Sequence, residues 1–331
     1  STLHWFRRCA LEVNAFHYSA VVSACEKCGR WAEALALLGI MARDHIERDT
    51  VTCNGVISAC EKSGKWEEAL ALLSWMVLAT IELSIRTCSA TISACEKGSK
   101  WAEALALLDK MVEYSIEMSN VACNAAISAC EKARQPDEAL ELFAELRQQG
   151  LEPDTIAFSA AISACEKGAR PDEAEELLGE MLRRRLQPHV ITFNSAISAC
   201  EKGRAPERAV ALLRSMGRRR LWPDVISYNA ALSACEKGVL PLQALDLFAE
   251  MQGAGLQPSE VTLNAVISAC EKGHRWEQAL DLFASMPSRR LQRSAISFNA
   301  TMSACEKGRR WQQALGLLDA MTASAVRPTL V

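Results

Sequence analysis

The chain has 331 residues, and half of them are hydrophobic, which is ample material for a continuous core. Its 37 basic and 40 acidic side chains give a formal net charge of −3. Proteins that hold nucleic acid mainly by bulk charge are usually strongly basic, so this balance argues against unspecific duplex binding, although it is compatible with a local basic stripe.

A phrase of five residues, Ser-Ala-Cys-Glu-Lys, recurs along the chain every 35 residues. The cysteines of its nine copies are Cys25, Cys60, Cys95, Cys130, Cys165, Cys200, Cys235, Cys270 and Cys305. A fixed period of about 20–50 residues is typical of a stacked array of small units. Such an array works through a long repeated surface more than through a single pocket.

The period divides the chain into nine units. They are residues 15–49, 50–84, 85–119, 120–154, 155–189, 190–224, 225–259, 260–294 and 295–329. Residues 1–14 are predicted to be a partial repeat, made of a second helix and a linker, and residues 330–331 to begin a truncated one. Because the chain shows neither an initiator methionine nor a targeting peptide, we expect a mature product or a fragment. Its most apolar stretch, residues 69–81, is shorter than the roughly 20 residues that a membrane-spanning helix needs.

Each unit is predicted to begin with one helix, as residues 51–62 illustrate. Cys53, Ile57 and Cys60 recur at the spacing of one helical face. One cysteine in the same place of every unit is typical of a packing residue, since a free cysteine behaves as a small buried hydrophobe. This reading also favours a reducing compartment over a disulfide framework.

A second helix is predicted in each unit, from Trp66 to about Val77 in the unit 50–84, with its own apolar stripe. Its first residue is Trp or Pro in every unit: Trp31, Trp66, Trp101, Pro136, Pro171, Pro206, Pro241, Trp276 and Trp311. Proline is tolerated in the first helical turn, so both residue types indicate the same helix start. Packing is the favoured role of the tryptophans, and base stacking is the alternative. A lone hairpin cannot cover two apolar faces, so neighbouring units must stack.

The helical hairpin of 35 residues resembles the pentatricopeptide repeat family. The matching phrases include residues 223–232 (Pro-Asp-Val-Ile-Ser-Tyr-Asn-Ala-Ala-Leu) and 244–251 (Ala-Leu-Asp-Leu-Phe-Ala-Glu-Met). The uniform spacing is similar to that of the P class, whereas the tetratricopeptide family has a period of about 34. The resemblance implies an all-α, right-handed superhelical solenoid. It also implies a protein of mitochondria or chloroplasts that binds single-stranded RNA at roughly one base per repeat.

The resemblance places the first base selector on the first helix of each unit. These residues are Ser19, Asn54, Ser89, Asn124, Ser159, Asn194, Asn229, Asn264 and Asn299. We expect them on the helix face opposite the cysteines, with capping or solvation near a helix start as the alternative.

The second selector is the last residue of each unit. These residues are Asp49, Ser84, Ser119, Asp154, His189, Asp224, Ser259, Ser294 and Thr329. Asp, Ser and Thr are good N-caps, so capping of the next first helix and base selection can coexist here.

The family pattern assigns a base to each pair of selectors. Asn with Asp favours uracil (Asn124/Asp154, Asn194/Asp224), Asn with Ser favours cytosine (Asn54/Ser84, Asn229/Ser259, Asn264/Ser294), and Ser19/Asp49 leans to guanine. Ser89/Ser119 and Ser159/His189 are read as purines and Asn299/Thr329 as a pyrimidine. The resulting target is 5′-G-C-R-U-R-U-C-C-Y-3′, read by hydrogen bonds to Watson–Crick edges.

The resemblance implies that the residue three places before each first selector clamps a base, with helix packing as the alternative. These clamp residues are Phe16, Val51, Arg86, Val121, Ile156, Ile191, Ile226, Val261 and Ile296. Arg86 departs from the apolar pattern, although a guanidinium can also stack on a base.

One lysine per unit is expected to follow the phosphate chain of a bound strand. These are Lys27, Lys62, Lys97, Lys132, Lys167, Lys202, Lys237, Lys272 and Lys307. The alternative is a solvated Glu-Lys surface in which each lysine complements the C-terminus of its helix.

No constellation for catalysis is found. Cys25 and Cys28 form a lone CxxC, whereas a zinc site takes about four ligands. We therefore expect a non-enzymatic protein with no cofactor, metal, membrane or small-molecule substrate. The resemblance implies that it acts in organellar RNA stabilisation, processing, splicing or translation. Other RNA-processing proteins are possible partners. Two alternatives are a protein-interaction scaffold within a ribonucleoprotein and the RNA-binding part of a processing enzyme whose catalytic domain lies outside this sequence.

Overall fold

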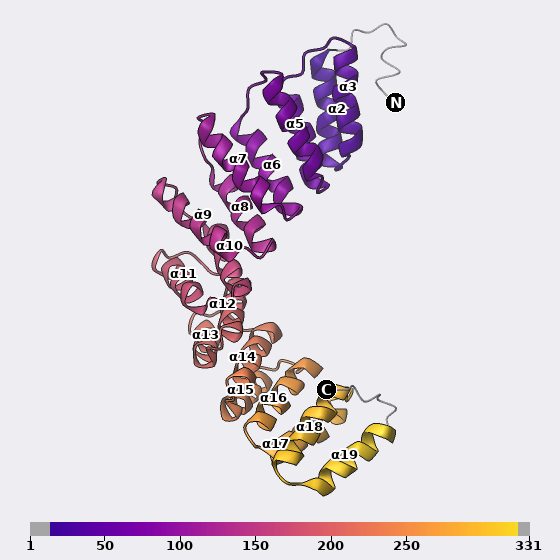
Figure 1. Cartoon of the computed structure of the whole chain (residues 1–331), viewed down its shortest axis with the longest axis vertical. Helices are drawn as coiled ribbons and strands as arrows, with labels where there is room; N and C mark the ends of the chain where they lie inside the picture. The colour runs from indigo at the N-terminus through magenta and orange to yellow at the C-terminus, as the bar shows by residue number, and fades with distance from the viewer. Residues whose placement is uncertain (1–13, 324–331) are drawn as a thin grey trace. The chain divides into compact units, whose positions relative to one another are not determined.

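The computed structural model describes residues 14–323, which form nine successive pairs of α-helices and contain no strand (Figure 1). The first helices of the pairs are α2 (Ala15–Lys27), α4 (Thr50–Lys62), α6 (Ile85–Lys97), α8 (Asn120–Lys132), α10 (Thr155–Lys167), α12 (Val190–Lys202), α14 (Val225–Lys237), α16 (Glu260–Lys272) and α18 (Ala295–Lys307). The second helices are α3 (Trp31–Arg43), α5 (Trp66–Leu78), α7 (Trp101–Glu113), α9 (Pro136–Gln148), α11 (Pro171–Arg183), α13 (Pro206–Arg218), α15 (Pro241–Gly253), α17 (Trp276–Ser285) and α19 (Trp311–Ala323). The predicted all-α solenoid of stacked helix pairs is confirmed.

The chain divides into two compact units, one that ends at Ala164 and one that begins at Cys165, inside α10. Within each unit, a first helix contacts the first helices of neighbouring repeats, its own second helix and the second helix before it. The backbones of the second helices stay farther from one another than those of the first helices. The first helices therefore form the inner row of each unit. None of the helices between residues 14 and 323 has the length and hydropathy needed to cross a lipid bilayer.

The second helices begin at the predicted Trp and Pro residues, and these side chains pack against the next repeat. A Cβ atom added to Gly98, just past the end of α6, would lie 2.4 Å from Cδ1 of Trp66. The same addition at Gly238 would lie 2.3 Å from Cγ of Pro206. Glycine leaves room for this close approach of backbone and side chain. The contacts support packing as the role of these tryptophans.

Proline also explains the one second helix that is shorter than the others in the described chain. α17 ends at Ser285, and a 3-10 turn, η1 (Pro287–Arg289), follows it. Proline has no backbone N–H, so it cannot continue the hydrogen-bonding pattern of an α-helix.

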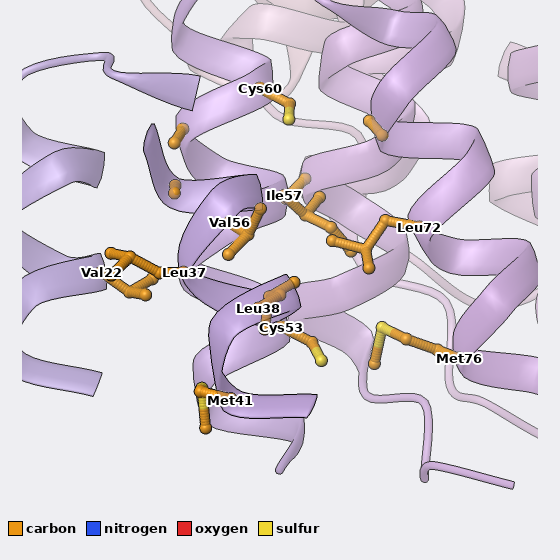
Figure 2. Packing of buried hydrophobic residues seen from close by; sticks show 14 of the residues in the cluster. Val22, Leu37, Leu38, Met41, Cys53, Val56, Ile57, Cys60, Leu72 and Met76 are labelled. Atoms are coloured by element: carbon orange, nitrogen blue, oxygen red, sulfur yellow. The ribbon is translucent and has the colours of Figure 1, made fainter. Parts of the chain in front are cut away.

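The repeated cysteines lie in the core between the two helices of a repeat. In Figure 2, Cys53 and Cys60 of α4 lie on the side of that helix that faces Leu72 and Met76 of α5, and all but Leu72 are fully buried. Burial raises the pKa of the Cys60 thiol to about 11. Every described cysteine is a free thiol, and the predicted packing role is confirmed for the buried ones.

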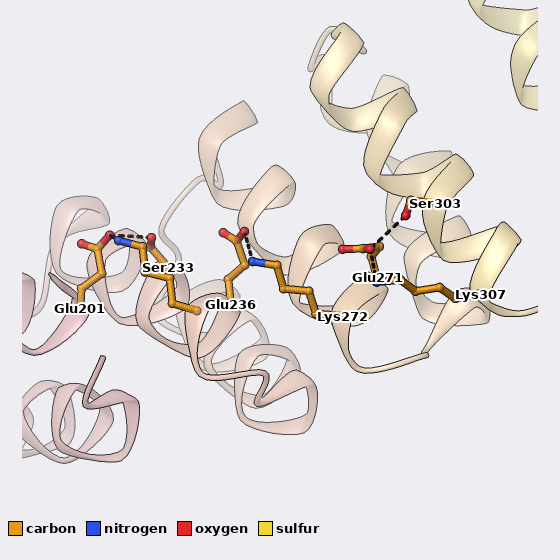
Figure 3. A network of polar contacts seen from close by, with 8 residues as sticks. Glu201, Ser233, Glu236, Glu271, Lys272, Ser303 and Lys307 are labelled. Carbon is orange, nitrogen blue, oxygen red and sulfur yellow. Dashed lines mark hydrogen bonds and ion pairs between the residues drawn. The ribbon is translucent and has the colours of Figure 1, made fainter. Parts of the chain in front are cut away.

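The phrase Ser-Ala-Cys-Glu-Lys joins neighbouring repeats within each of the two compact parts of the chain. Glu201 Oε1 accepts hydrogen bonds from Ser233 Oγ at 2.7 Å and from Lys237 Nζ at 2.8 Å, both from the next repeat (Figure 3). Glu271 binds Ser303 and Lys307 in the same way. Ala and Cys of the phrase are buried between these polar residues. The phrase therefore combines a core residue with a polar link between repeats.

Candidate nucleic-acid interface

The first selectors lie at the contact between neighbouring first helices. The side chains of Asn54, Asn124 and Asn194 are each less than a tenth exposed. The expectation that these residues occupy the face opposite the cysteines is wrong. A helix advances about 100° per residue, so Asn54 lies beside Cys53 rather than opposite it and points toward the next repeat.

In four repeats, the first and second selectors, which are 30 residues apart in sequence, are joined by hydrogen bonds. These pairs are Asn54–Ser84 (Nδ2 to Oγ, 3.3 Å), Ser89–Ser119 (Oγ to Oγ, 3.2 Å), Asn124–Asp154 (Nδ2 to Oδ1, 3.1 Å, and to Oδ2, 3.0 Å) and Asn194–Asp224 (Nδ2 to Oδ1, 3.3 Å). Two residues that the sequence pattern pairs are thus adjacent in space. Thr329 lies outside the described residues.

Several second selectors also cap the helix that follows them. Asp49 Oδ1 accepts from the backbone N–H of Thr52 at 2.9 Å, and Asp224 Oδ1 accepts from that of Ser227 at 2.8 Å. Burial alone would raise the pKa of the Asp224 carboxyl, but hydrogen bonds from Ser227 and Asn194 outweigh it and lower the pKa. Asp224 is therefore held as a carboxylate. His189 forms no such cap.

A third set of polar side chains, which the sequence interpretation missed, contacts the first selectors. The hydroxyl of Thr87, the third residue of α6, donates to Asn54 Oδ1 at 2.6 Å. Ser227 donates to Asn194 Oδ1 at 2.6 Å, and Thr262 donates to Asn229 Oδ1 at 2.7 Å. The available signal was a hydroxyl residue 33 places after each of these asparagines.

The apolar clamp residues are exposed, one helical turn before the selectors. Their side chains are between 62% and 78% exposed in Phe16, Val51, Val121, Ile156, Ile191, Ile226, Val261 and Ile296. Arg86 is exposed as well. Packing into the core therefore does not explain these residues. Between α16 and α18, Ile296 and Asn299 line a surface hollow together with Ala300 and Ser303.

The lysines form ion pairs between repeats. These pairs are Lys62–Glu26, Lys97–Glu61, Lys132–Glu96, Lys202–Glu166, Lys237–Glu201, Lys272–Glu236 and Lys307–Glu271. Each carboxylate balances a lysine, so this surface carries little net charge. The pairs give the lysines a structural role, and contact with phosphate stays a prediction.

Models of three related repeat families match the chain. The pentacotripeptide-repeat region of PRORP matches residues 79–238, the PPR repeat family matches residues 48–97 and 223–272, and the PPR repeat matches residues 16–46, 261–291 and 296–324. No curated protein sequence matches the chain at a significant level.

Solved structures with the same fold include the pentatricopeptide repeat protein PPR10 from maize. Its TM-score is 0.77 at 22% sequence identity, over 97% of this chain and 45% of that one. PPR10 in complex with an 18-nt psaJ RNA element has a TM-score of 0.69 at 22% identity, over 97% of this chain and 47% of that one. Nuclear proteinaceous RNase P 2 from A. thaliana has a TM-score of 0.50 at 13% identity, over 54% of this chain and 40% of that one.

This chain spans less than half the length of these structures. Their likeness to it extends to the fold of stacked helix pairs. The matches to the repeat models cover residues 16–324 almost without a break. The recurring phrase, the paired helices and these matches show together that the chain belongs to the pentatricopeptide repeat family.

Proposed function

We propose that the chain binds single-stranded RNA and reads one base per repeat. The observation that carries this proposal is the recurrence, at a fixed register, of an exposed clamp residue one helical turn before a polar selector, which in four repeats is hydrogen-bonded to the second selector. Exposed apolar side chains in a regular row mark a binding surface. A base offers an apolar face to the clamp and a polar edge to the selectors, and one base per helical repeat is a known mode of RNA recognition.

The chemistry of the selectors fits the assigned pyrimidines. The carboxylate of Asp224 only accepts hydrogen bonds, which suits the N3–H of uracil, while the amide of Asn194 donates to a carbonyl oxygen. Where the second selector is Ser84 or Ser259, its hydroxyl can donate to the unprotonated N3 of cytosine. The proposed target remains 5′-G-C-R-U-R-U-C-C-Y-3′.

The proposed role is binding without catalysis, in an organelle, where occupancy of a transcript would protect or remodel it. The fold supports binding because the selectors and clamps are spread over successive repeats, as a strand of RNA requires. The PPR10 complex supports the ligand class, because that protein shares the fold and holds an RNA element.

A titration tests the proposal. The full chain is mixed with fluorescein-labelled nine-base RNA of the proposed sequence, with a scrambled RNA of the same composition and with the matching DNA. The proposal predicts the tightest binding to the first RNA. Equal affinity for all three, with a steep dependence on salt, would indicate attraction to phosphate alone. No binding to any of them would favour a protein-interaction scaffold.

A further inference from the structure

Hydroxyl groups at the third position of the first helices lie against the amides of the preceding selectors. The amide of Asn54 is held at both ends, since its Nδ2 donates to Ser84 Oγ at 3.3 Å and its Oδ1 accepts from Thr87 Oγ1 at 2.6 Å. The hydroxyls of Ser84 and Thr87 are themselves 2.8 Å apart. The three side chains form a hydrogen-bonded cluster.

Such contacts restrain the amide at both of its ends. An asparagine amide can present either its carbonyl oxygen or its NH₂ group by turning about 180°, and the two choices suit opposite base edges. A hydroxyl that donates to Oδ1 keeps the carbonyl occupied and leaves an N–H of Nδ2 for the ligand. Where the second selector is an aspartate, its carboxylate only accepts hydrogen bonds and therefore faces Nδ2, and the hydroxyl restrains the amide at its other end.

Two repeats with identical selectors differ in this hydroxyl. In the pair Asn194/Asp224, the third position holds Ser227, which donates to Asn194 Oδ1 at 2.6 Å. In the pair Asn124/Asp154, Ala157 occupies the same position, and Asn124 Oδ1 is buried without a hydrogen-bond partner among the described residues. Both asparagines still donate to their aspartate, so the hydroxyl is the difference at the amide oxygen.

We infer that Thr87, Ser227 and Thr262 are positioning residues that sharpen base discrimination in the preceding repeat by restraining the orientation of its asparagine amide. The inference rests on the proposed RNA-binding function. Each acts on one base, because each hydroxyl contacts the selector of one repeat. Repeats without the hydroxyl contact, such as the repeat that contains Asn124, discriminate less sharply between bases that differ in hydrogen-bond donors and acceptors.

Reciprocal substitutions in the full chain test the inference. Affinities are measured for the nine-base RNA with U or C at position 4, read by Asn124, and at position 6, read by Asn194. The discrimination ratio is the Kd for C divided by the Kd for U. Ser227→Ala is expected to lower the ratio at position 6 by roughly fivefold, the factor of one neutral hydrogen bond. Ala157→Ser is expected to raise the ratio at position 4, and Ser227→Thr to keep the wild-type ratio.

A matched control separates amide orientation from helix capping. The hydroxyl of Ser297 donates to the backbone carbonyl of Ser294 at 2.8 Å, and Asn264 Oδ1 has no hydrogen-bond partner in the described structure. Ser297→Ala therefore removes a similar hydroxyl and should leave the ratio at position 8 unchanged. Ratios that stay at wild-type values in both Ser227→Ala and Ala157→Ser, while RNA is still bound selectively, would overturn the inference alone. A wild-type chain that binds no RNA would overturn the proposed function and the inference with it.

Discussion

Two isoleucines of α12 provide a sharp test of which surface meets RNA. Ile191 is a proposed clamp and is 77% exposed, whereas Ile197 is fully buried in the core of the same helix. The same substitution, to alanine, should therefore affect RNA affinity at one position and folding stability at the other. Ile191→Ala should weaken RNA binding and leave stability unchanged, and Ile197→Ala should lower stability.

The magnitudes follow from burial. Complete burial of an isoleucine side chain is worth about 1.5–3 kcal/mol, so a base that covers half of Ile191 would contribute about 1 kcal/mol, or roughly a fivefold change in Kd. A substitution at an exposed site usually changes stability by less than about 0.5 kcal/mol. Ile197→Ala should cost about 2–5 kcal/mol of unfolding free energy, because it opens a cavity in a close-packed core.

Urea denaturation measures the stability of the three proteins, and fluorescence anisotropy measures their affinity for the nine-base RNA. Folding and binding are read separately, so a fall in affinity that merely reflects unfolding is recognised. The assignment of the clamp surface is refuted if Ile191→Ala binds RNA as tightly as the wild type, or if it destabilises the fold as much as Ile197→Ala does.

Three further predictions concern stability and thiol chemistry. Val239 is exposed and has a φ of 57°, a left-handed backbone conformation that strains a β-branched residue. Val239→Gly should therefore raise the unfolding free energy by about 1 kcal/mol in urea melts. An unchanged unfolding free energy would contradict this strain. Glu201→Ala should lower the unfolding free energy by about 1–2 kcal/mol, because it removes the hydrogen-bond acceptor shared by Ser233 and Lys237. A double-mutant cycle of Glu201 and Lys237 should give a coupling energy of about 0.5 kcal/mol. Zero coupling would refute the link between the repeats. Burial raises the pKa of the core thiols to about 11 or 12, above their ordinary value of 9.0, so the folded state keeps protons that the unfolded state loses and stability should fall as pH rises from 9 toward 12. A flat pH profile in that window would contradict thiol burial.

The architecture could be predicted from the sequence because the period repeats it nine times. The starts of the second helices followed from Trp and Pro at one position, since proline is tolerated in the first turn of a helix but not in its interior. The shortened α17 had a local cause in Pro287, which also stands in the sequence.

The candidate site was predicted in part. The spacing paired Asn194 with Asp224, and the structure places the two within hydrogen-bond distance. The exposure of the clamps could not be read from the sequence, because a β-branched residue on a helix suits a core as well as a surface. The contact of Ser227 with Asn194 depends on how neighbouring first helices pack, which a single repeat does not specify.

The lysines show why charge patterns alone are ambiguous. A cation at a constant pitch fits a phosphate chain, yet Lys237 and its equivalents reach back to a carboxylate 36 residues earlier. The partner lies in another repeat, so only the stacking of helices reveals it. The same contact explains how a chain with a row of lysines has almost no net charge on this surface.

The central claim is that one pair of selectors chooses one base, and Asn194→Thr tests it most directly. The wild-type chain and this variant are each titrated with the nine-base RNA and with the same RNA carrying G in place of U at position 6. The account predicts that the wild type prefers U, that the variant prefers G, and that preferences at the other eight positions stay unchanged. A variant that loses affinity equally for both RNAs, or a wild type indifferent to the base at position 6, would contradict it.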